Sequence, residues 1–270
     1  MTSQSTGPAN AARVVQLSDM HLFANTSDVL VGMNCEEGLR DVLQLIRSSE
    51  PQLSAILCTG DISQDNSLAS YQRLERALTE LRVPQYWIPG NHDELARMRE
   101  ALGTQNSCFQ RSFSLPGWRV VLLNSSVEGE VYGRLNAQEL NALEHELEQG
   151  DDNVLICLHH NPVPVGAHWL QRHALQNPNE LFARIDACPR VRVVLFGHIH
   201  HELESERNGV IYLGAPSTSV QFHPTSFDFA LDNRNPGYRW LDLYADGRFD
   251  TGVRRVANKR YPVDFSGIGY

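Results

Sequence analysis

Residues 14–21 read Val-Val-Gln-Leu-Ser-Asp-Met-His, an apolar run that ends in Asp19 and His21. Short apolar runs bounded by polar residues are typical of buried strands. Residues i and i+2 of an extended chain point to the same side, so we expect Asp19 and His21 to face one cleft together. This pattern determines the interpretation of the whole sequence, because it occurs four more times.

Four further apolar runs also end in side chains that can bind a metal ion. The residues that follow these runs are Asp61; then Asn91, His92 and Asp93; then His159 and His160; and last His198 and His200, which the same alternation places toward one cleft. Open α/β sheets build their sites at the carboxyl ends of their strands. We therefore expect five strands to bring these side chains to one edge.

Helical patterns separate the strands. Apolar residues at helical spacing predict two helices, around 39–46 and 71–81, and Asn136 followed by Glu139 predicts the start of a third, which Gly150 ends. Residues 163–180 show little periodicity and are interpreted as a long loop, whereas strand patterns predominate after Leu203. Alternating strands and helices favour an α/β architecture with parallel pairing.

Length and charge limit the possible classes of protein. The chain has 270 residues and a net charge of −9, which disfavours nucleic-acid binding because that relies on clustered Lys and Arg. Its longest apolar runs are far shorter than the roughly 20 residues of a membrane span. Five cysteines without a CxxC pair favour reduced thiols and a cytoplasmic location. No obligate protein partner is indicated.

We expect a single catalytic domain with two terminal extensions. The domain would cover residues 13–256, preceded by a disordered arm at 1–12. A tail at 257–270 would pack on the domain or trail from it.

The types of ligand narrow the chemistry. Any one of these residues alone is more often a turn former, a helix cap or a hydrogen-bonded histidine, but five such strand endings in one chain favour a metal site. Two Asp, one Asn and four His without a thiolate suit iron, manganese, zinc or cobalt. Seven ligands are too many for one tetrahedral ion and suit two ions that share a carboxylate. Two such ions typically catalyse phosphoryl displacement.

These motifs also resemble a known family. Asp19-x-His21, Gly60-Asp61, Gly90-Asn91-His92-Asp93, His159 and Gly197-His198-x-His200 resemble, in order, the motif set of the calcineurin-like metallophosphoesterase superfamily. Flanking stretches resemble the bacterial class III cyclic-AMP phosphodiesterases, namely 16–23, 59–65, Trp169-Leu170 with His173, 197–203 and 216–222. The resemblance implies a four-layer αββα sandwich, in which helices flank two mixed β-sheets.

The same resemblance implies a metal assignment and a reaction. Asp19, His21, Asp61 and His200 would hold one ion, while Asp61 (as a bridge), Asn91, His159 and His198 would hold the other. The ions would be iron or manganese, with zinc or cobalt as further possibilities. A metal-bridging hydroxide would open 3′,5′-cyclic AMP to 5′-AMP and so lower cyclic-AMP signalling.

Two residues next to the ligands receive catalytic roles. We expect His92 to stabilise the phosphoryl charge and protonate the leaving oxygen, and Asp93 to orient His92. Expected substrate contacts are His21, Asn91, His92, His200, His160 and Trp169.

Two alternative functions stay open at this point. One is a phosphomonoesterase or a broader diesterase that uses the same ions. The other is a binding scaffold without catalysis, which is disfavoured because no ligand is missing.

Overall fold

Two mixed sheets form the centre of the protein. The computed structural model describes residues 11–104, 106–267 and 269. The first sheet contains β1 (Ala11–Leu17), β2 (Ala55–Thr59), β3 (Gln85–Ile88), β12 (Gly237–Tyr244) and β13 (Phe249–Arg255), in the order β13-β12-β1-β2-β3. The second contains β4 (Ser112–Leu115), β5 (Trp118–Leu122), β6 (Asn153–Leu158), β7 (Val191–Phe196), β8 (Leu203–Arg207) and β9 (Val210–Gly214), in the order β4-β5-β6-β7-β9-β8. A short hairpin pairs β10 (Gln221–Phe222) with β11 (Leu231–Asp232).

Alternate residues of the central strands enter two separate cores. Val14 of β1 packs between the sheets with Leu155 and Leu195 of the second sheet. Val15 of β1 and the equivalent residues of the other central strands, each next to an inward-facing residue, point outward into the core beneath the helices. This period of two explains why the strands appear as continuous apolar runs, since both faces are buried.

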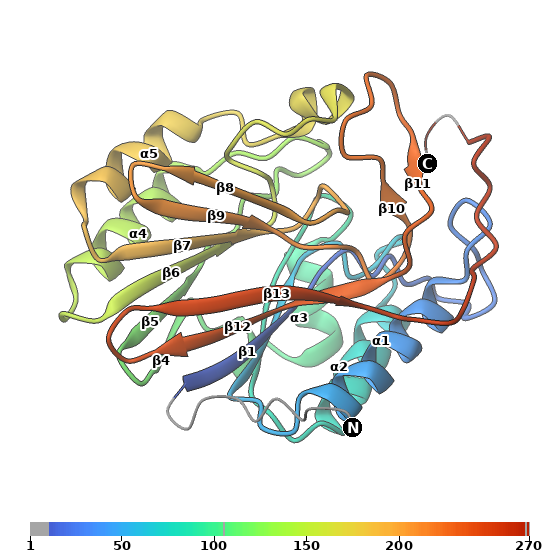
Figure 1. Cartoon of the computed structure of the whole chain (residues 1–270), viewed down its shortest axis with the longest axis horizontal. Helices are drawn as coiled ribbons and strands as arrows, with labels where there is room; N and C mark the ends of the chain where they lie inside the picture. The colour runs from blue at the N-terminus through green and yellow to red at the C-terminus, as the bar shows by residue number, and fades with distance from the viewer. Residues whose placement is uncertain (1–10, 105, 268, 270) are drawn as a thin grey trace, which may run out of the picture.

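Helices cover the outer faces (Figure 1). On the first sheet lie α1 (Cys35–Ser49), α2 (Leu68–Thr79) and α3 (Leu95–Leu102), and on the second lie α4 (Ala137–Glu148) and α5 (Pro178–Ala187). Asn136 caps α4 as expected, with its side chain accepting from the Glu139 N–H at 2.9 Å. The predicted four-layer αββα sandwich is therefore confirmed.

Three differences between the structure and the expected elements concern residues 163–180, the end of α2 and the start of β1. The expected loop 163–180 contains a 3₁₀ helix, η2 (His168–His173), and the start of α5, where Pro178 occupies the first turn. α2 ends at Thr79, so Leu81 lies beyond it. β1 begins at Ala11, because Ala11 and Ala12 pair with β12; the arm therefore cannot include them, and residues 1–10 lie outside the described residues.

The parallel strands fix the position of the site. β1, β2 and β3 run parallel in one sheet, and β5, β6, β7 and β9 run parallel in the other. Near the carboxyl ends of these strands, the buried Gln16 side chain joins the two sheets. Its Nε2 donates to Thr59 Oγ1 at 2.9 Å and to the Phe196 carbonyl at 3.0 Å. The carboxyl ends of β1, β2, β3, β6 and β7 therefore meet at one edge.

Residues 257–267 fold back on the body of the protein. The Asp264 N–H donates to the Val31 carbonyl at 2.8 Å, and the Tyr261 hydroxyl donates to Asp41 of α1 at 2.7 Å. Lys259 pairs with the same Asp41 carboxylate. In Figure 1 the tail runs from the end of β13 past α1 and up toward the hairpin of β10 and β11.

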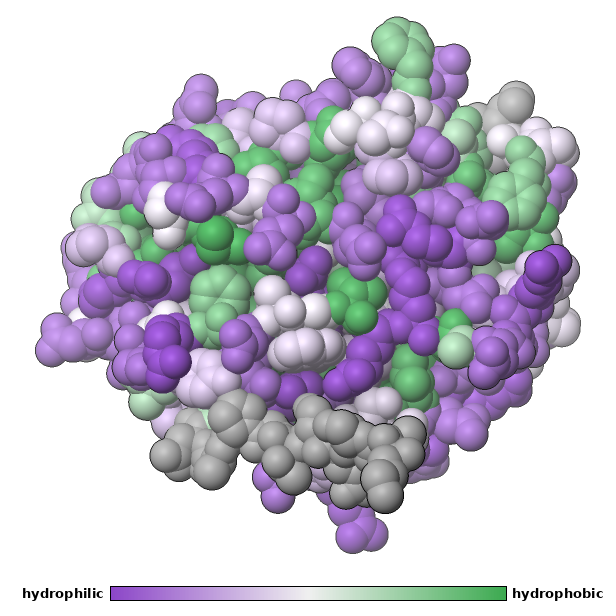
Figure 2. Space-filling model, in the orientation of Figure 1, coloured by the Kyte–Doolittle hydropathy of each residue, from purple (hydrophilic) through white to green (hydrophobic). Residues whose placement is uncertain are grey.

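All five cysteines are free and buried. Within the described residues, none of the helices combines the length and the apolar character needed to cross a membrane. Figure 2 shows that the apolar residues on this face form small separate patches among polar ones.

Candidate active site

The turns after the strands, rather than an extended chain, aim the ligand side chains. Asp19, His21, Asp61, His198 and His200 all have positive φ, between 49° and 68°. The expected i, i+2 alternation is therefore wrong as the reason for their convergence. Left-handed backbone at residues other than glycine is uncommon and concentrates at functional sites. Each turn redirects the chain so that its side chain points across the strand ends.

A first donor set gathers at the ends of β1, β2 and β7. The candidate ligand atoms of Asp19, His21, Asp61 and His200 all lie within 4.8 Å of one another, and all four residues are buried. His21 Nε2 lies 3.1 Å from His200 Nε2, and His200 Nε2 lies 3.4 Å from Asp19 Oδ1. This set contains the four residues that the resemblance assigns to one ion.

A second donor set adjoins the first through Asp61. Asp61 Oδ2 lies 3.2 Å from His159 Nε2 and 3.8 Å from His21 Nε2, so one carboxylate oxygen faces both sets. Asn91 Oδ1 lies 3.2 Å from His159 Nε2 and 3.0 Å from His198 Nδ1. The fold therefore brings together the second expected group of ligands, which is Asp61, Asn91, His159 and His198.

Hydrogen bonds behind the rings fix three of the histidines. Nδ1 of His159 donates to the Thr59 carbonyl at 2.7 Å, and Nδ1 of His200 donates to the Val220 carbonyl at 2.9 Å. Nδ1 of His21 lies 2.6 Å from Gln64 Oε1. These contacts leave each Nε2 directed at the donor set, as partners behind metal-binding histidines commonly do.

Burial lowers the pKa of two of the four candidate histidine ligands. It lowers the pKa of His21 to about 3 and that of His198 well below its ordinary value. Burial would also lower the pKa of His159, but the Asp61 carboxylate outweighs it and raises that pKa to about 9. Neutral imidazoles with free lone pairs are the form that binds metal ions.

Two glycines permit the turns to approach closely. A Cβ on Gly197 would lie 3.0 Å from Asp19 Oδ2 and closer still to Ser18 Oγ. A Cβ on Gly90 would overlap the Asp61 carboxylate. Both glycines are therefore required by proximity to a ligand and not by turn geometry alone.

The two expected catalytic residues flank Asn91. The His92 N–H donates to Asp61 Oδ1 at 2.8 Å, and its ring lies with its centre 5.0 Å from that of His21. The Asp93 carboxylate accepts from the backbone N–H groups of Ile62, Ser63 and Gly90 at 3.0–3.1 Å. Asp93 thus joins two ligand-bearing turns, and its positioning of His92 stays a prediction.

His160 is held away from the role expected for it. Its Nδ1 lies 2.8 Å from Ser125 Oγ, and its Nε2 lies 3.1 Å from the Val131 carbonyl. The ring lies close to His159 and His198 but directs both nitrogens to protein partners. Contact with substrate stays a prediction that this geometry disfavours.

A chain of rings connects Trp169 to the first donor set. Phe222 stacks on His200 with the ring centres 3.9 Å apart, and Trp169 packs edge-on against Phe222 at 4.9 Å. Phe222 is not among the site residues expected from the sequence. It lies in β10, far along the chain from the strand endings, so periodicity carries no signal for this contact.

The donor sets fit two divalent ions. Imidazole nitrogens, carboxylates and one carboxamide oxygen suit iron, manganese, zinc or cobalt. His198 Nε2 is buried and has no hydrogen-bond partner within the described part of the chain. Seven donor residues converge here, and one of them, Asp61, faces both sets. A centre of two ions, one in each set, is therefore the simplest account of the site.

Comparison with known proteins agrees with this geometry. The profile described as "Calcineurin-like phosphoesterase" matches residues 12–202. The chain is 42% identical, over the full length of both chains, to a Pseudomonas aeruginosa protein named 3′,5′-cyclic adenosine monophosphate phosphodiesterase CpdA. It is 43% identical to a 3′,5′-cyclic-nucleotide phosphodiesterase of Nostoc sp., with 90% of this chain and 92% of that protein covered.

Among solved structures, a dimetal phosphatase from Danio rerio superposes with a TM-score of 0.62. It shares 16% sequence identity with this chain, and the match covers 92% of this chain and 100% of that one. At that identity the similarity establishes the fold alone.

Proposed function

Since the chain belongs to the calcineurin-like phosphoesterase family, we propose that it hydrolyses 3′,5′-cyclic AMP to 5′-AMP at a dinuclear metal site. The observation that carries the proposal is the single Asp61 carboxylate oxygen between two donor sets. The full-length similarity to the Pseudomonas aeruginosa phosphodiesterase supports the substrate. Water adds to phosphorus, the bond from phosphorus to the 3′-oxygen breaks, and that oxygen takes up a proton.

Each donor set would hold one ion. Asp19, His21, Asp61 and His200 would bind the first, and Asp61, Asn91, His159 and His198 the second, with iron or manganese as the proposed metals. When bound, two such ions polarise the phosphoryl group and provide a nucleophile at neutral pH. The chain's contribution is a set of three imidazole rings whose Nδ1 atoms are held by Thr59, Val220 and Gln64.

His92 is the proposed general acid. Its backbone N–H is fixed to Asp61 Oδ1, and its ring is only partly buried, so the ring can meet a substrate from the open side. Proton donation to the leaving 3′-oxygen is typically worth ~10²–10⁴-fold in rate. Asp93 would act as a positioning residue, because its carboxylate holds the turn that carries His92.

The substrate's phosphate would contact His21, Asn91, His92 and His200, which surround the convergent donor atoms. Trp169 is the proposed contact for the adenine, since Phe222 connects its ring to His200. Aromatic side chains bind bases by stacking. Five free buried thiols are in keeping with the reducing cytoplasm that we propose as the location.

The test is the initial rate on 3′,5′-cyclic AMP for protein stripped of metal and refilled with Fe²⁺, Mn²⁺ or Zn²⁺. The proposal expects metal-dependent release of 5′-AMP, with the stripped protein inactive. Parallel assays use bis(p-nitrophenyl) phosphate and p-nitrophenyl phosphate. Turnover of either of these without cyclic AMP turnover would keep the metal site and refute the substrate.

A broader cyclic-nucleotide phosphodiesterase is the second candidate. The Nostoc relative, similar over nine-tenths of this chain, carries a name that specifies no base. Cyclic GMP assayed beside cyclic AMP distinguishes the two candidates, since equal kcat/KM values would favour the broader one.

A further inference from the structure

A cavity separate from the metal site lies behind residues 219–221, the segment whose Val220 carbonyl holds His200. It has a volume of about 710 Å³, and Ser219, Val220 and Gln221 form one wall. The tail residues from Lys259 to Phe265 contribute another wall. The seven donor residues of the metal site do not line it. Pockets of ~300–1,000 Å³ commonly hold small organic ligands.

The polar frame of this cavity is already bonded within the protein. Arg234 Nε donates to Asp232 at 2.7 Å, and Arg234 Nη1 donates to Glu202 at 3.1 Å. Asn235 Nδ2 donates to the Lys259 carbonyl at 2.8 Å. Lys259 itself pairs with Asp41 and Glu37 outside the cavity, so the frame is fixed before any ligand arrives.

Among the three cationic side chains that line the cavity, Arg260 differs from Arg234 and Lys259, which are both paired with carboxylates. It forms no ion pair or side-chain hydrogen bond with the described part of the chain, and it is exposed. Three cationic side chains and one carboxylate line the cavity, although the whole chain carries a net charge of −9. Since the other two cations are paired with carboxylates, the unpaired Arg260 guanidinium favours a phosphate or carboxylate, which it can bind through two hydrogen bonds.

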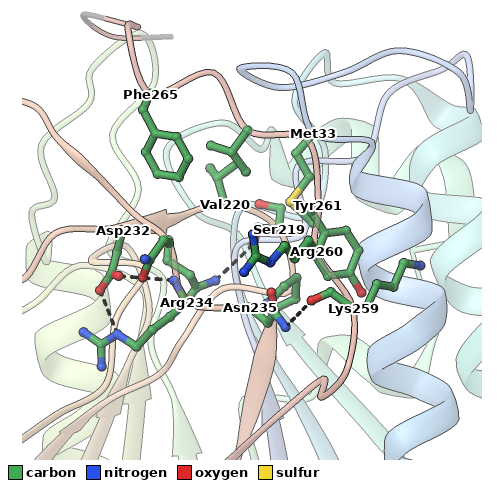
Figure 3. Close-up of a pocket in the computed structure, with 14 residues that line it drawn as sticks. Met33, Ser219, Val220, Asp232, Arg234, Asn235, Lys259, Arg260, Tyr261 and Phe265 are labelled. Atoms are coloured by element: carbon green, nitrogen blue, oxygen red, sulfur yellow. Dashed lines mark hydrogen bonds and ion pairs between the residues drawn. The ribbon is translucent and has the colours of Figure 1, made fainter.

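Aromatic rings flank the same space. Figure 3 shows Phe265 and Tyr261 on opposite sides of the cavity in that view, with Arg234 and Asn235 below them. Phe265 is 56% exposed, one of four large apolar side chains that are exposed in the described residues. Rings beside a guanidinium suit a ligand that joins an anionic group to a planar ring system.

We propose that this cavity is a second ligand site, for a small organic phosphate that carries a planar base, such as a nucleoside monophosphate. Arg260 binds the phosphate, and Phe265 and Tyr261 contact the base. The choice of 5′-AMP as the probe rests on the proposed function, since that reaction would release it. The ligand class itself rests only on the cavity.

The wall of this site touches the metal centre from behind. Val220 lines the cavity, and its carbonyl accepts from His200 Nδ1 at 2.9 Å. Ser219 also lines it, and its hydroxyl donates to the Asp19 carbonyl at 3.1 Å. A ligand in the cavity would therefore contact Ser219 and Val220, the residues that bond to Asp19 and His200 of the first donor set.

The test is a calorimetric titration of metal-loaded enzyme with 5′-AMP. The wild type should show two binding events per chain, one at the metals and one in the cavity. Arg260→Gln should weaken the second event about tenfold or more, in line with a charge-assisted hydrogen bond, and leave the first unchanged. Phe265→Ala should also weaken only the second event.

Arg192→Gln is the matched control, because Arg192 is also exposed and lies on β7 outside the cavity lining. One binding event in the wild type, or a second event that both cavity variants leave intact, would overturn the inference. If adenosine binds in the cavity as tightly as 5′-AMP, the phosphate does not contribute to binding, and that part of the proposal is wrong. If cyclic AMP is not hydrolysed yet the second event is present and lost in Arg260→Gln, the proposed function fails and this site stands.

Discussion

Gly197→Ala should damage the metal site through a single methyl group. The added Cβ would lie closer than 3.0 Å to Ser18 Oγ, 3.0 Å from Asp19 Oδ2 and 3.1 Å from the Thr59 carbonyl. Overpacking of this kind costs about 1–3 kcal/mol of unfolding free energy. Because Asp19 accepts from the His198 N–H, relief of the overlap moves residues of both donor sets at once.

The expected effect on catalysis exceeds the effect on stability. Misplacement of reacting groups by ~1 Å can cost about 10²-fold in rate, so kcat on bis(p-nitrophenyl) phosphate should fall by about that factor. Metal content, measured by mass spectrometry on the same samples, should fall with it. Ser18→Ala in the same chain removes the worst overlap and should restore part of the rate.

Two controls separate the site from general strain. Ser18→Ala alone loses only a long hydrogen bond of 3.4 Å to the Thr59 carbonyl and should leave kcat nearly unchanged. Gly209→Ala meets nothing within 4 Å but has φ of 79°, so it should lower stability by about 1 kcal/mol without touching catalysis. A Gly197→Ala enzyme with wild-type kcat and metal content would refute the reasoning.

Three further outcomes follow from the site and the tail. His92→Ala should keep two metal ions per chain and lose ~10²–10⁴-fold in kcat; a fall in metal content would instead make His92 a ligand. Asp61→Asn keeps the size of the side chain but removes the shared charge, so both ions should be lost, and one fully occupied site would contradict the bridge. Burial would raise the pKa of Asp41, but Lys259 and Tyr261 outweigh it and lower that pKa below 3.8. Because the folded value is the lower one, the Asp41 contribution to stability is present above pH 3.8 and lost as the pH falls through the lowered pKa. The difference in unfolding free energy between the wild type and Asp41→Asn should therefore hold at neutral pH and vanish in acid; a constant difference would rule out this pairing.

The strand endings could be predicted because their signal is local. Each ligand of the two donor sets follows an apolar run within a few residues, and parallel strands that are buried on both faces bring such endings to one edge. The α4 cap at Asn136 is equally local, since the side chain bonds three residues ahead. By contrast, α5 was not predicted, because its apolar face rests on only two buried residues, Leu181 and Ile185.

The residues by themselves predicted an α/β fold and the seven candidate ligands, and the family resemblance added the four-layer sandwich and the expected assignment of those ligands to two ions. Only the tertiary structure decided how these ligands converge, through left-handed turns at residues such as Asp19 and His198 in place of an extended chain. It also decided that His160 turns to Ser125, that Phe222 stacks on His200, and that the tail closes a second cavity. These contacts join residues far apart along the chain, so no local sequence pattern predicts them.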